Sequence, residues 1–129
     1  HPNEIKASID LAKLFIDKNN KNKNRLVVIF QPHRFSRVKQ FIHEFAEELS
    51  KADVIYLTNI YGAGEANSDN IRSEIISDTI SQKNKNVKCL NNYNEITKNF
   101  YKLTQKNDFI LNMGAGDCNI FWSLLTNKN

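Results

Sequence analysis

Three side chains that can carry positive charge, those of His33, Arg34 and Arg37, fall within five positions of the sequence. They lie at or just before the predicted start of a helix. The amino end of a helix favours an anion through its free amides and its dipole, and two arginines there are unfavourable because like charges meet. A bound carboxylate or phosphate would relieve that repulsion, and a guanidinium offers a planar fork that matches a carboxylate. The spacing indicates such an anion site, or alternatively a solvated basic turn with Phe35 packed into the core.

The four glycines lie in two other short segments, residues 60–65 and 114–117. Glycine lets the backbone come close to a ligand or to a neighbouring helix, although glycine turns are often only tight connections. The second segment does not complete a Gly-x-Gly-x-x-Gly pattern, because Asn119 stands at the third glycine position, so it does not predict a dinucleotide site. In the first segment, Glu65 could hold a ligand ammonium or pair with an arginine of the basic turn, or the segment could be a plain loop.

Length and composition indicate one domain. The chain has 129 residues, of which 40% are hydrophobic, and it has no apolar run typical of a membrane span or a signal peptide. Cys89 and Cys118 form no metal or redox spacing, which favours a reduced, cytoplasmic protein. The net charge of +4 raises the question of nucleic-acid binding, but much of the lysine lies in asparagine-rich stretches that are typical of solvated loops. We therefore predict neither a nucleic-acid nor a membrane partner.

Several common catalytic arrangements are missing from the sequence. It has no Gly-x-x-x-x-Gly-Lys-Ser/Thr phosphate loop, no cluster with the spacing of metal ligands, and no spacing that suggests a Ser-His-Asp set. We therefore predict no catalytic residue and no metal site in this chain.

Helices and short apolar strands are predicted to alternate along the chain. Helices are expected over residues 3–18, 37–51, 70–81, 92–103 and 118–125. Strands are expected over residues 25–30, 53–58, 87–90 and 109–113. Asn3 and Asn92 are the predicted caps of the first and fourth helices, because an asparagine side chain can accept a hydrogen bond from a free amide of the first turn.

This order of elements predicts an α/β fold, in which a mostly parallel sheet has helices on both faces and right-handed crossovers. We expect a single three-layer, Rossmann-like domain over residues 1–129. The pattern also calls for a strand before the first helix, and we therefore expect the chain to be a piece of a larger protein. In open parallel sheets ligands bind at the carboxyl ends of the strands, which is where the basic turn and both glycine segments fall.

Four segments of the chain resemble, in the same order, the C-terminal third of the Mur ligases. They are His1-Pro2-x-Glu4-Ile5, Gln31-Pro32-His33-Arg34-Phe35-Ser36-Arg37, Tyr61-x-Ala63-Gly64-Glu65 and Met113-Gly114-Ala115-Gly116-Asp117. The resemblance spans nearly the whole chain, and Pro-His-Arg-x-Ser-Arg is its most specific part. It points to the subtype that joins L-alanine to UDP-N-acetylmuramic acid, since members that add glutamate, a diamino acid or a dipeptide differ there.

The resemblance implies one part of a three-domain enzyme. In this family a central domain carries the phosphate loop and holds most of the ATP and Mg²⁺, an amino-terminal domain binds the UDP substrate, and the Rossmann-like third domain closes over the site. The muramoyl carboxylate is activated as an acyl phosphate, and the amine of L-alanine then attacks it. The implied partners are L-alanine, UDP-N-acetylmuramic acid, ATP and the other two domains of the same chain, in peptidoglycan precursor synthesis.

The resemblance also implies roles for individual residues. His33, Arg34 and Arg37 would line the L-alanine pocket, where the arginines would clamp the carboxylate and leave the amine free. Contacts to the nucleotide or to the closing domains would come from His1, Tyr61, Glu65, Gly114 and Gly116.

Two positions depart from the family's pattern. Asn59 stands where an aspartate is usual, and Gly-Asp-Cys-Asn follows the last strand in place of Gly-Asp-Ile-Gly. The second change weakens the case for a close backbone approach there, and neither touches the arginine motif.

Two other hypotheses stay open on the sequence. The chain could be a stand-alone nucleotide- or anion-binding module without catalysis, or, on net charge alone, a weak nucleic-acid binder. A ligase would need a phosphate-loop domain ahead of His1, whereas a binding module would begin with its own first strand.

Overall fold

A parallel sheet with helices on both faces forms the framework of the computed structural model, which describes residues 1–19 and 24–114. The helices are α1 (Pro2–Asn19), α2 (Phe35–Leu49), α3 (Ser73–Ile80), α4 (Tyr93–Lys98) and α5 (Phe100–Leu103). The strands are β1 (Leu26–Gln31), β2 (Val54–Leu57), β3 (Val87–Cys89) and β4 (Phe109–Gly114). All of their pairings are parallel, in the order β3-β2-β1-β4. The predicted α/β class and parallel sheet are therefore confirmed.

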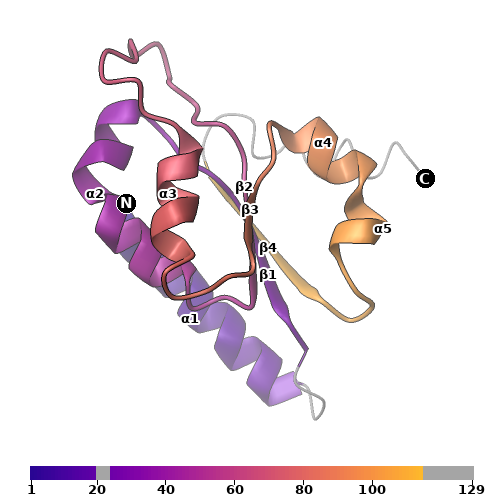
Figure 1. Ribbon diagram of the computed structural model, residues 1–129. Coiled ribbons are helices and arrows are strands. Elements are labelled where there is room, and N and C mark those ends of the chain that lie inside the picture. Colours follow the sequence, from indigo (N-terminus) through magenta and orange to yellow (C-terminus); the bar gives the residue numbers. More distant parts are fainter. Residues whose placement is uncertain (20–23, 115–129) are drawn as a thin grey trace.

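Two apolar cores lie on opposite faces of the sheet, as the arrangement of the helices in Figure 1 makes visible. Leu26, Val28 and Phe30 point toward the core under α1, α2 and α3. Val27 and Ile29 point the other way, toward α4 and α5. Every residue of β1 is buried, because the strand has a partner on each edge and helices over each face.

Strands are added first on one side of β1 and then on the other. From β1 the chain moves outward through β2 to β3, with α2 and α3 on one face, and it then returns by way of α4 and α5 on the other face to place β4 against the opposite edge of β1. The connections that leave β1 and enter β4 thus separate to opposite faces. Such a reversal leaves a crevice at the carboxyl ends of the two strands, where ligands bind in open α/β sheets.

The predicted cap of the first helix is wrong, whereas that of the fourth is confirmed. Helix α1 begins at Pro2, whose fixed backbone suits a first helical position, and the Nδ1 atom of His1 accepts a hydrogen bond from the amide of Asn3 at 3.1 Å. The side chain of Asn92 accepts from the amide of Glu95 at 3.0 Å, as expected.

Asparagine side chains account for two other boundary errors. Helix α3 begins at Ser73 rather than residue 70, because the side chain of Asn67 holds both backbone groups of Ile71 in a turn. The helix expected over residues 92–103 is divided at Asn99, whose side-chain amide donates to the carbonyl of Glu95. The helix expected over residues 118–125 lies outside the described residues.

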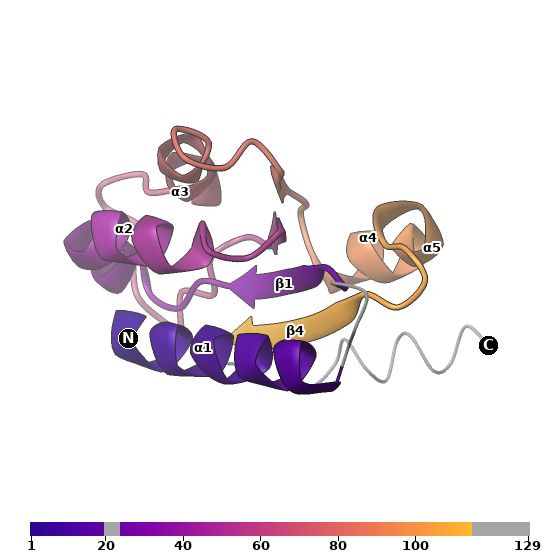
Figure 2. The same ribbon diagram turned by 90° about the horizontal axis from the view of Figure 1, so that it is seen from below.

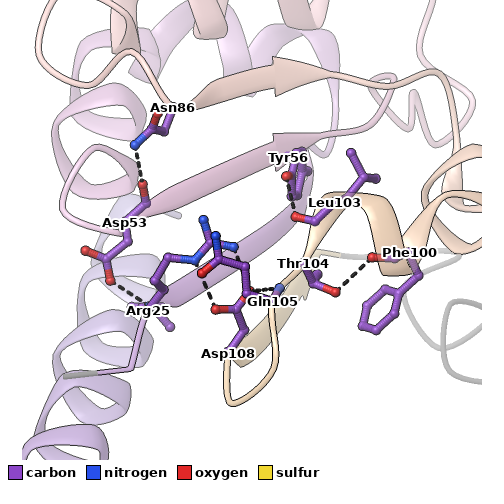
Figure 3. A network of polar contacts seen from close by, with 10 residues as sticks. Arg25, Asp53, Tyr56, Asn86, Phe100, Leu103, Thr104, Gln105 and Asp108 are labelled. Carbon is purple, nitrogen blue, oxygen red and sulfur yellow. Dashed lines mark hydrogen bonds and ion pairs between the residues drawn. The ribbon is translucent and has the colours of Figure 1, made fainter. Parts of the chain in front are cut away.

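The amino ends of the strands are held together by a polar network (Figure 3). Arg25 donates two hydrogen bonds to Asp108, at 3.0 and 2.8 Å, and thereby ties the start of β1 to the start of β4. The carboxylate of Asp53 accepts from the amide of Leu26 at 2.6 Å, which ties β1 to the segment before β2. Burial by itself raises the pKa of Asp108, but the hydrogen bonds from Arg25 and from the Gln105 amide outweigh it and hold the pKa below its ordinary value of 3.8.

We expect Asp108→Asn to lower the free energy of unfolding at pH 7 by about 2 kcal/mol, because a charged bidentate pair is lost and Arg25 keeps its charge. Asp108 has a lowered folded-state pKa, so its contribution is present above pH 3.8 and is lost as the pH falls through the lower, folded value. Urea unfolding at several pH values measures this, and the difference between the two proteins should shrink below pH 3.8. Asp69→Asn, which breaks an exposed pair with Lys39, is the control and should change little. An equal loss for both variants would contradict the assignment.

Candidate functional site

A cavity of about 280 Å³ opens at the reversal point of the sheet. Its walls include His1 and Ile5 of α1, Phe30 and Gln31 of β1, Met113 and Gly114 of β4, and His33 and Arg37 from the start of α2. Three segments that are far apart in the sequence thus meet at the carboxyl ends of the two central strands. The position is the one that the fold rule assigns to a ligand.

The basic turn is fixed to the neighbouring glycine turn by backbone hydrogen bonds. The amide of Arg34 donates to the carbonyl of Tyr61 at 2.8 Å, and the amide of Tyr61 donates to the carbonyl of Pro32 at 2.8 Å. These bonds extend the parallel pairing of β1 and β2 beyond the strand ends, and the ring of His33 stacks on that of Tyr61 with centroids 5.8 Å apart. Arg34 itself has a φ of 67°, a conformation that a side chain with a Cβ atom rarely adopts.

Glu65, which lies in the glycine segment over residues 60–65, caps the amino end of helix α2. Its carboxylate oxygens accept from the amide and from the hydroxyl of Ser36, both at 2.7 Å. These bonds to Ser36, together with the positive charge of Arg34, outweigh desolvation and lower the pKa of Glu65 below its ordinary value of 4.5. The amino end of α2 therefore already has an anion of the protein's own. The sequence had led us to expect that a ligand anion would offset the positive charges there, but Glu65 occupies that position.

The three basic side chains of the turn differ in their surroundings. His33 and Arg37 are half-buried and line the cavity, whereas Arg34 is exposed and is absent from the cavity wall formed by the described residues. Burial and the positive charges of Arg37 and Arg34 lower the pKa of His33 below its ordinary value of 6.5. His33 is therefore neutral at pH 7, and Arg37 is the cation that the turn contributes to the cavity wall.

The remaining predicted contact residues are divided between two cavities. His1 and Gly114 share the first cavity with Arg37, and the His1 ring packs against Phe41, where the φ and ψ angles of α2 are not helical. Tyr61, which is 39% exposed, lines a second cavity of about 260 Å³ on the other side of Gln31. Gly116 lies outside the described residues.

Gln31 and Ser36 are two site residues that the sequence reasoning did not identify. Gln31 is only 7% exposed, lines both cavities, and its Oε1 atom has no hydrogen-bond partner among the described residues. A glutamine at the end of an otherwise apolar strand was the available signal. Ser36 gave no such signal, because its partner Glu65 is 29 positions away.

Gly114 is required by the contact between β4 and β1. It has a φ of +149°, and a Cβ atom added there would lie 2.9 Å from both the Cβ atom and the carbonyl oxygen of Gln31. The backbone of β4 therefore approaches β1 closely at the cavity.

Neither a metal cluster nor a membrane-crossing helix is found in the part of the chain that the structure describes. No three His, Cys, Asp or Glu side chains there are grouped as metal ligands. None of the described helices is both long enough and apolar enough to cross a bilayer.

The sequence of this chain is similar to one family model and to known ligases. Residues 1–116 match the family model described as "Mur ligase, glutamate ligase domain". A UDP-N-acetylmuramate–L-alanine ligase of Prochlorococcus marinus subsp. pastoris is 67% identical over 133 aligned residues, which cover 100% of this chain and 28% of that protein. The protein of the same name from Prochlorococcus marinus strain NATL1A is 39% identical over 99% of this chain and 28% of its own length. The chain thus spans little more than a quarter of these relatives.

A solved structure has the same fold. It is a domain from a Haemophilus ducreyi 35000HP protein described as a UDP-N-acetylmuramate:L-alanyl-gamma-D-glutamyl-meso-diaminopimelate ligase. The two structures superpose with a TM-score of 0.67 at 19% identity, over 100% of this chain and 85% of that one. At this identity the likeness establishes the fold alone.

We expect Ser36→Ala to raise the pKa of Glu65 toward 4.5, because one of its two hydrogen bonds from Ser36 is removed while the backbone amide remains. A carboxyl-detected NMR titration of both proteins measures the shift. Ser77→Ala, which removes a hydroxyl bonded to a helix carbonyl elsewhere, is the matched control and should leave Glu65 unchanged. The cap would be refuted by a Glu65 that titrates at its ordinary value in the unaltered protein.

Proposed function

Because the chain belongs to the Mur ligase family, as its C-terminal domain, we propose that it is the amino-acid-binding domain of a ligase that joins L-alanine to UDP-N-acetylmuramic acid. The substrates are proposed from the names of two relatives, and this chain covers 28% of the length of each. The single observation that carries the proposal is the placement of Arg37 in the wall of a cavity at the carboxyl ends of β1 and β4.

The chemistry of the wall suits a small zwitterion. Arg37 provides a permanent positive charge and paired donors for the carboxylate of alanine. Neutral His33, held against Tyr61, can donate or accept one hydrogen bond beside it. Within residues 1–19 and 24–114, the buried Oε1 acceptor of Gln31 has no partner, and a ligand ammonium could donate to it. A ligand held by its carboxylate keeps its amino group accessible for reaction.

Within the ligase, the role proposed for this domain is to position the nucleophile. The alanine amine, once it has lost a proton, attacks the carbonyl carbon of the muramoyl acyl phosphate, an amide forms, and phosphate leaves. Fixing the carboxylate restricts where the amine can lie, which lowers the entropic part of the barrier. Arg34, exposed on the same turn, is proposed to contact substrate or a neighbouring domain when the ligase closes.

ATP and Mg²⁺ are proposed to be held mainly by the rest of the ligase. Among the residues that the structure describes, no three His, Cys, Asp or Glu side chains are grouped as metal ligands. Contacts to the nucleotide or to the closing domains stay predictions for His1, Tyr61, Glu65, Gly114 and Gly116.

We expect Arg37→Ala to raise the KM for L-alanine at least tenfold, since one charge-assisted hydrogen bond contributes roughly 1.5–3 kcal/mol, and to leave the KM for ATP nearly unchanged. Arg34→Ala should also raise the alanine KM, but by less, because its side chain is outside the cavity wall. The assay uses a chimera in which this chain replaces the matching 28% of the Prochlorococcus marinus subsp. pastoris ligase. Lys39→Ala, which removes an exposed cation of the same helix, is the matched control. An unchanged alanine KM in Arg37→Ala would refute the pocket.

We expect the 129-residue chain alone to form no amide from L-alanine, UDP-N-acetylmuramic acid and ATP, because it has no phosphate loop. Phosphate release and product formation can be measured in parallel with the chimera. Amide formation by the chain alone would refute the proposal that the rest of the ligase holds ATP.

A further inference from the structure

The start of helix α1 presents one side to the cavity that Arg37 lines. Figure 2 shows the arrowheads of β1 and β4 pointing toward the side of the molecule where α1 begins. Four lining residues at the start of α1 are three or four positions apart, which places them on the same side of the helix: His1, Glu4, Ile5 and Ser8. The first turns of α1 are therefore part of the ligand site as well as a support for the sheet.

Glu4 supplies the carboxylate of this wall. Among the described lining residues it is the single Asp or Glu, and Arg37 is the single Lys or Arg. Glu65, the acidic residue of the neighbouring turn, is bound to Ser36 and is not one of the described lining residues. The acidic and basic side chains thus give the cavity wall one charge of each sign, which is the charge pattern that complements a zwitterion.

The two charged side chains lie at different depths. Arg37 is half-buried, whereas 86% of the Glu4 side chain is exposed, with its carboxylate 4.0 Å from the amino group of His1. Ile5 and Phe45, which also line the cavity, are buried and apolar. A small amino acid whose carboxylate is bound by Arg37 would therefore direct its side chain toward the apolar lining and its ammonium toward Glu4 at the mouth.

On the basis of the function proposed above, we propose that Glu4 binds the ammonium group of the amino acid and thereby selects amines over hydroxyl analogues. A charged carboxylate attracts an ammonium but gives no such advantage to a hydroxyl, so a ligand without the amine is rejected. The neutral Oε1 atom of Gln31 can accept a hydrogen bond from either group and cannot make this distinction. Arg37, Glu4 and the apolar lining together contact three different groups around the α-carbon.

The exposed position of Glu4 also gives the amine a direction. An ammonium bound at the mouth faces outward, toward an acyl phosphate held by the rest of the ligase. The amine must lose a proton before it attacks, so the attraction to Glu4 acts on the bound ammonium and is weaker for the neutral, attacking amine. Removal of the carboxylate should therefore raise the KM for L-alanine without lowering kcat.

The test compares L-alanine with L-lactate, in which a hydroxyl replaces the ammonium. The KM for L-alanine and the inhibition constant of L-lactate are measured in the chimera with the 67% identical Prochlorococcus ligase, unaltered and with Glu4→Gln. We expect the unaltered chimera to bind L-lactate at least about fivefold more weakly than L-alanine. Glu4→Gln should raise the KM for L-alanine by about fivefold and change the constant for L-lactate by less than about twofold.

Glu74→Gln is the matched control, because Glu74 is also an acidic residue in the first turn of a helix, α3. An acidic group in this position stabilises a helix through its dipole, and a Glu4 with that role alone would not distinguish the two ligands. Each preference is a ratio of two ligands within one variant, so an effect of the substitution on the fold cancels. Arg37→Ala, measured in parallel, should weaken L-alanine but not L-alaninamide, which has no carboxylate.

Three outcomes would overturn the role of Glu4 and leave that of Arg37 intact. They are an unaltered chimera that binds L-lactate as tightly as L-alanine, a preference for L-alanine that survives Glu4→Gln, and a kcat that falls in Glu4→Gln. An Arg37→Ala variant that binds L-alanine normally would instead refute the carboxylate site, and with it the proposed function of the cavity. The two failures are therefore distinguishable.

Discussion

The burial of β1 along its whole length is the constraint on which the rest of the structure depends. A strand with six buried residues must have partners on both edges and helices over both faces, and the chain can satisfy this only by reversing its direction across the sheet. That reversal creates the crevice at the carboxyl end of β1. The two apolar cores, one under α1 to α3 and the other under α4 and α5, are consequences of the same requirement.

The charges of the basic turn are balanced partly from within. Glu65 occupies the amino end of α2, where an incoming anion was expected from the sequence, and its two hydrogen bonds from Ser36 connect the basic turn to residues 60–65. Burial keeps His33 neutral and leaves Arg37 as the positively charged residue that the turn adds to the cavity wall. The described wall therefore combines the opposite charges of Arg37 and Glu4 with neutral hydrogen-bonding groups, an arrangement suited to a small ligand of no net charge.

Local patterns predicted the elements and their order well, because apolar periodicity reports burial directly. They failed where an asparagine side chain competes with the helix backbone, at Asn67 and Asn99, since such bonds depend on geometry that periodicity does not encode. In the site, residue types and their spacing identified the basic turn. They could not show that Arg37 lines the cavity whereas Arg34 does not. That distinction arises from the backbone of Arg34 and from its bond to Tyr61, 27 positions away in the sequence. Residues 115–117 of the second glycine segment and the final predicted helix fall outside the described residues.

The φ of 67° at Arg34 has a consequence for how this sequence could drift over evolutionary time. A backbone in this region costs a residue with a Cβ atom roughly 1–3 kcal/mol, whereas glycine adopts it freely. Random substitution at this position would therefore favour glycine on stability alone. An arginine at this position is therefore retained against a stability gradient, so its retention depends on what the guanidinium itself contributes.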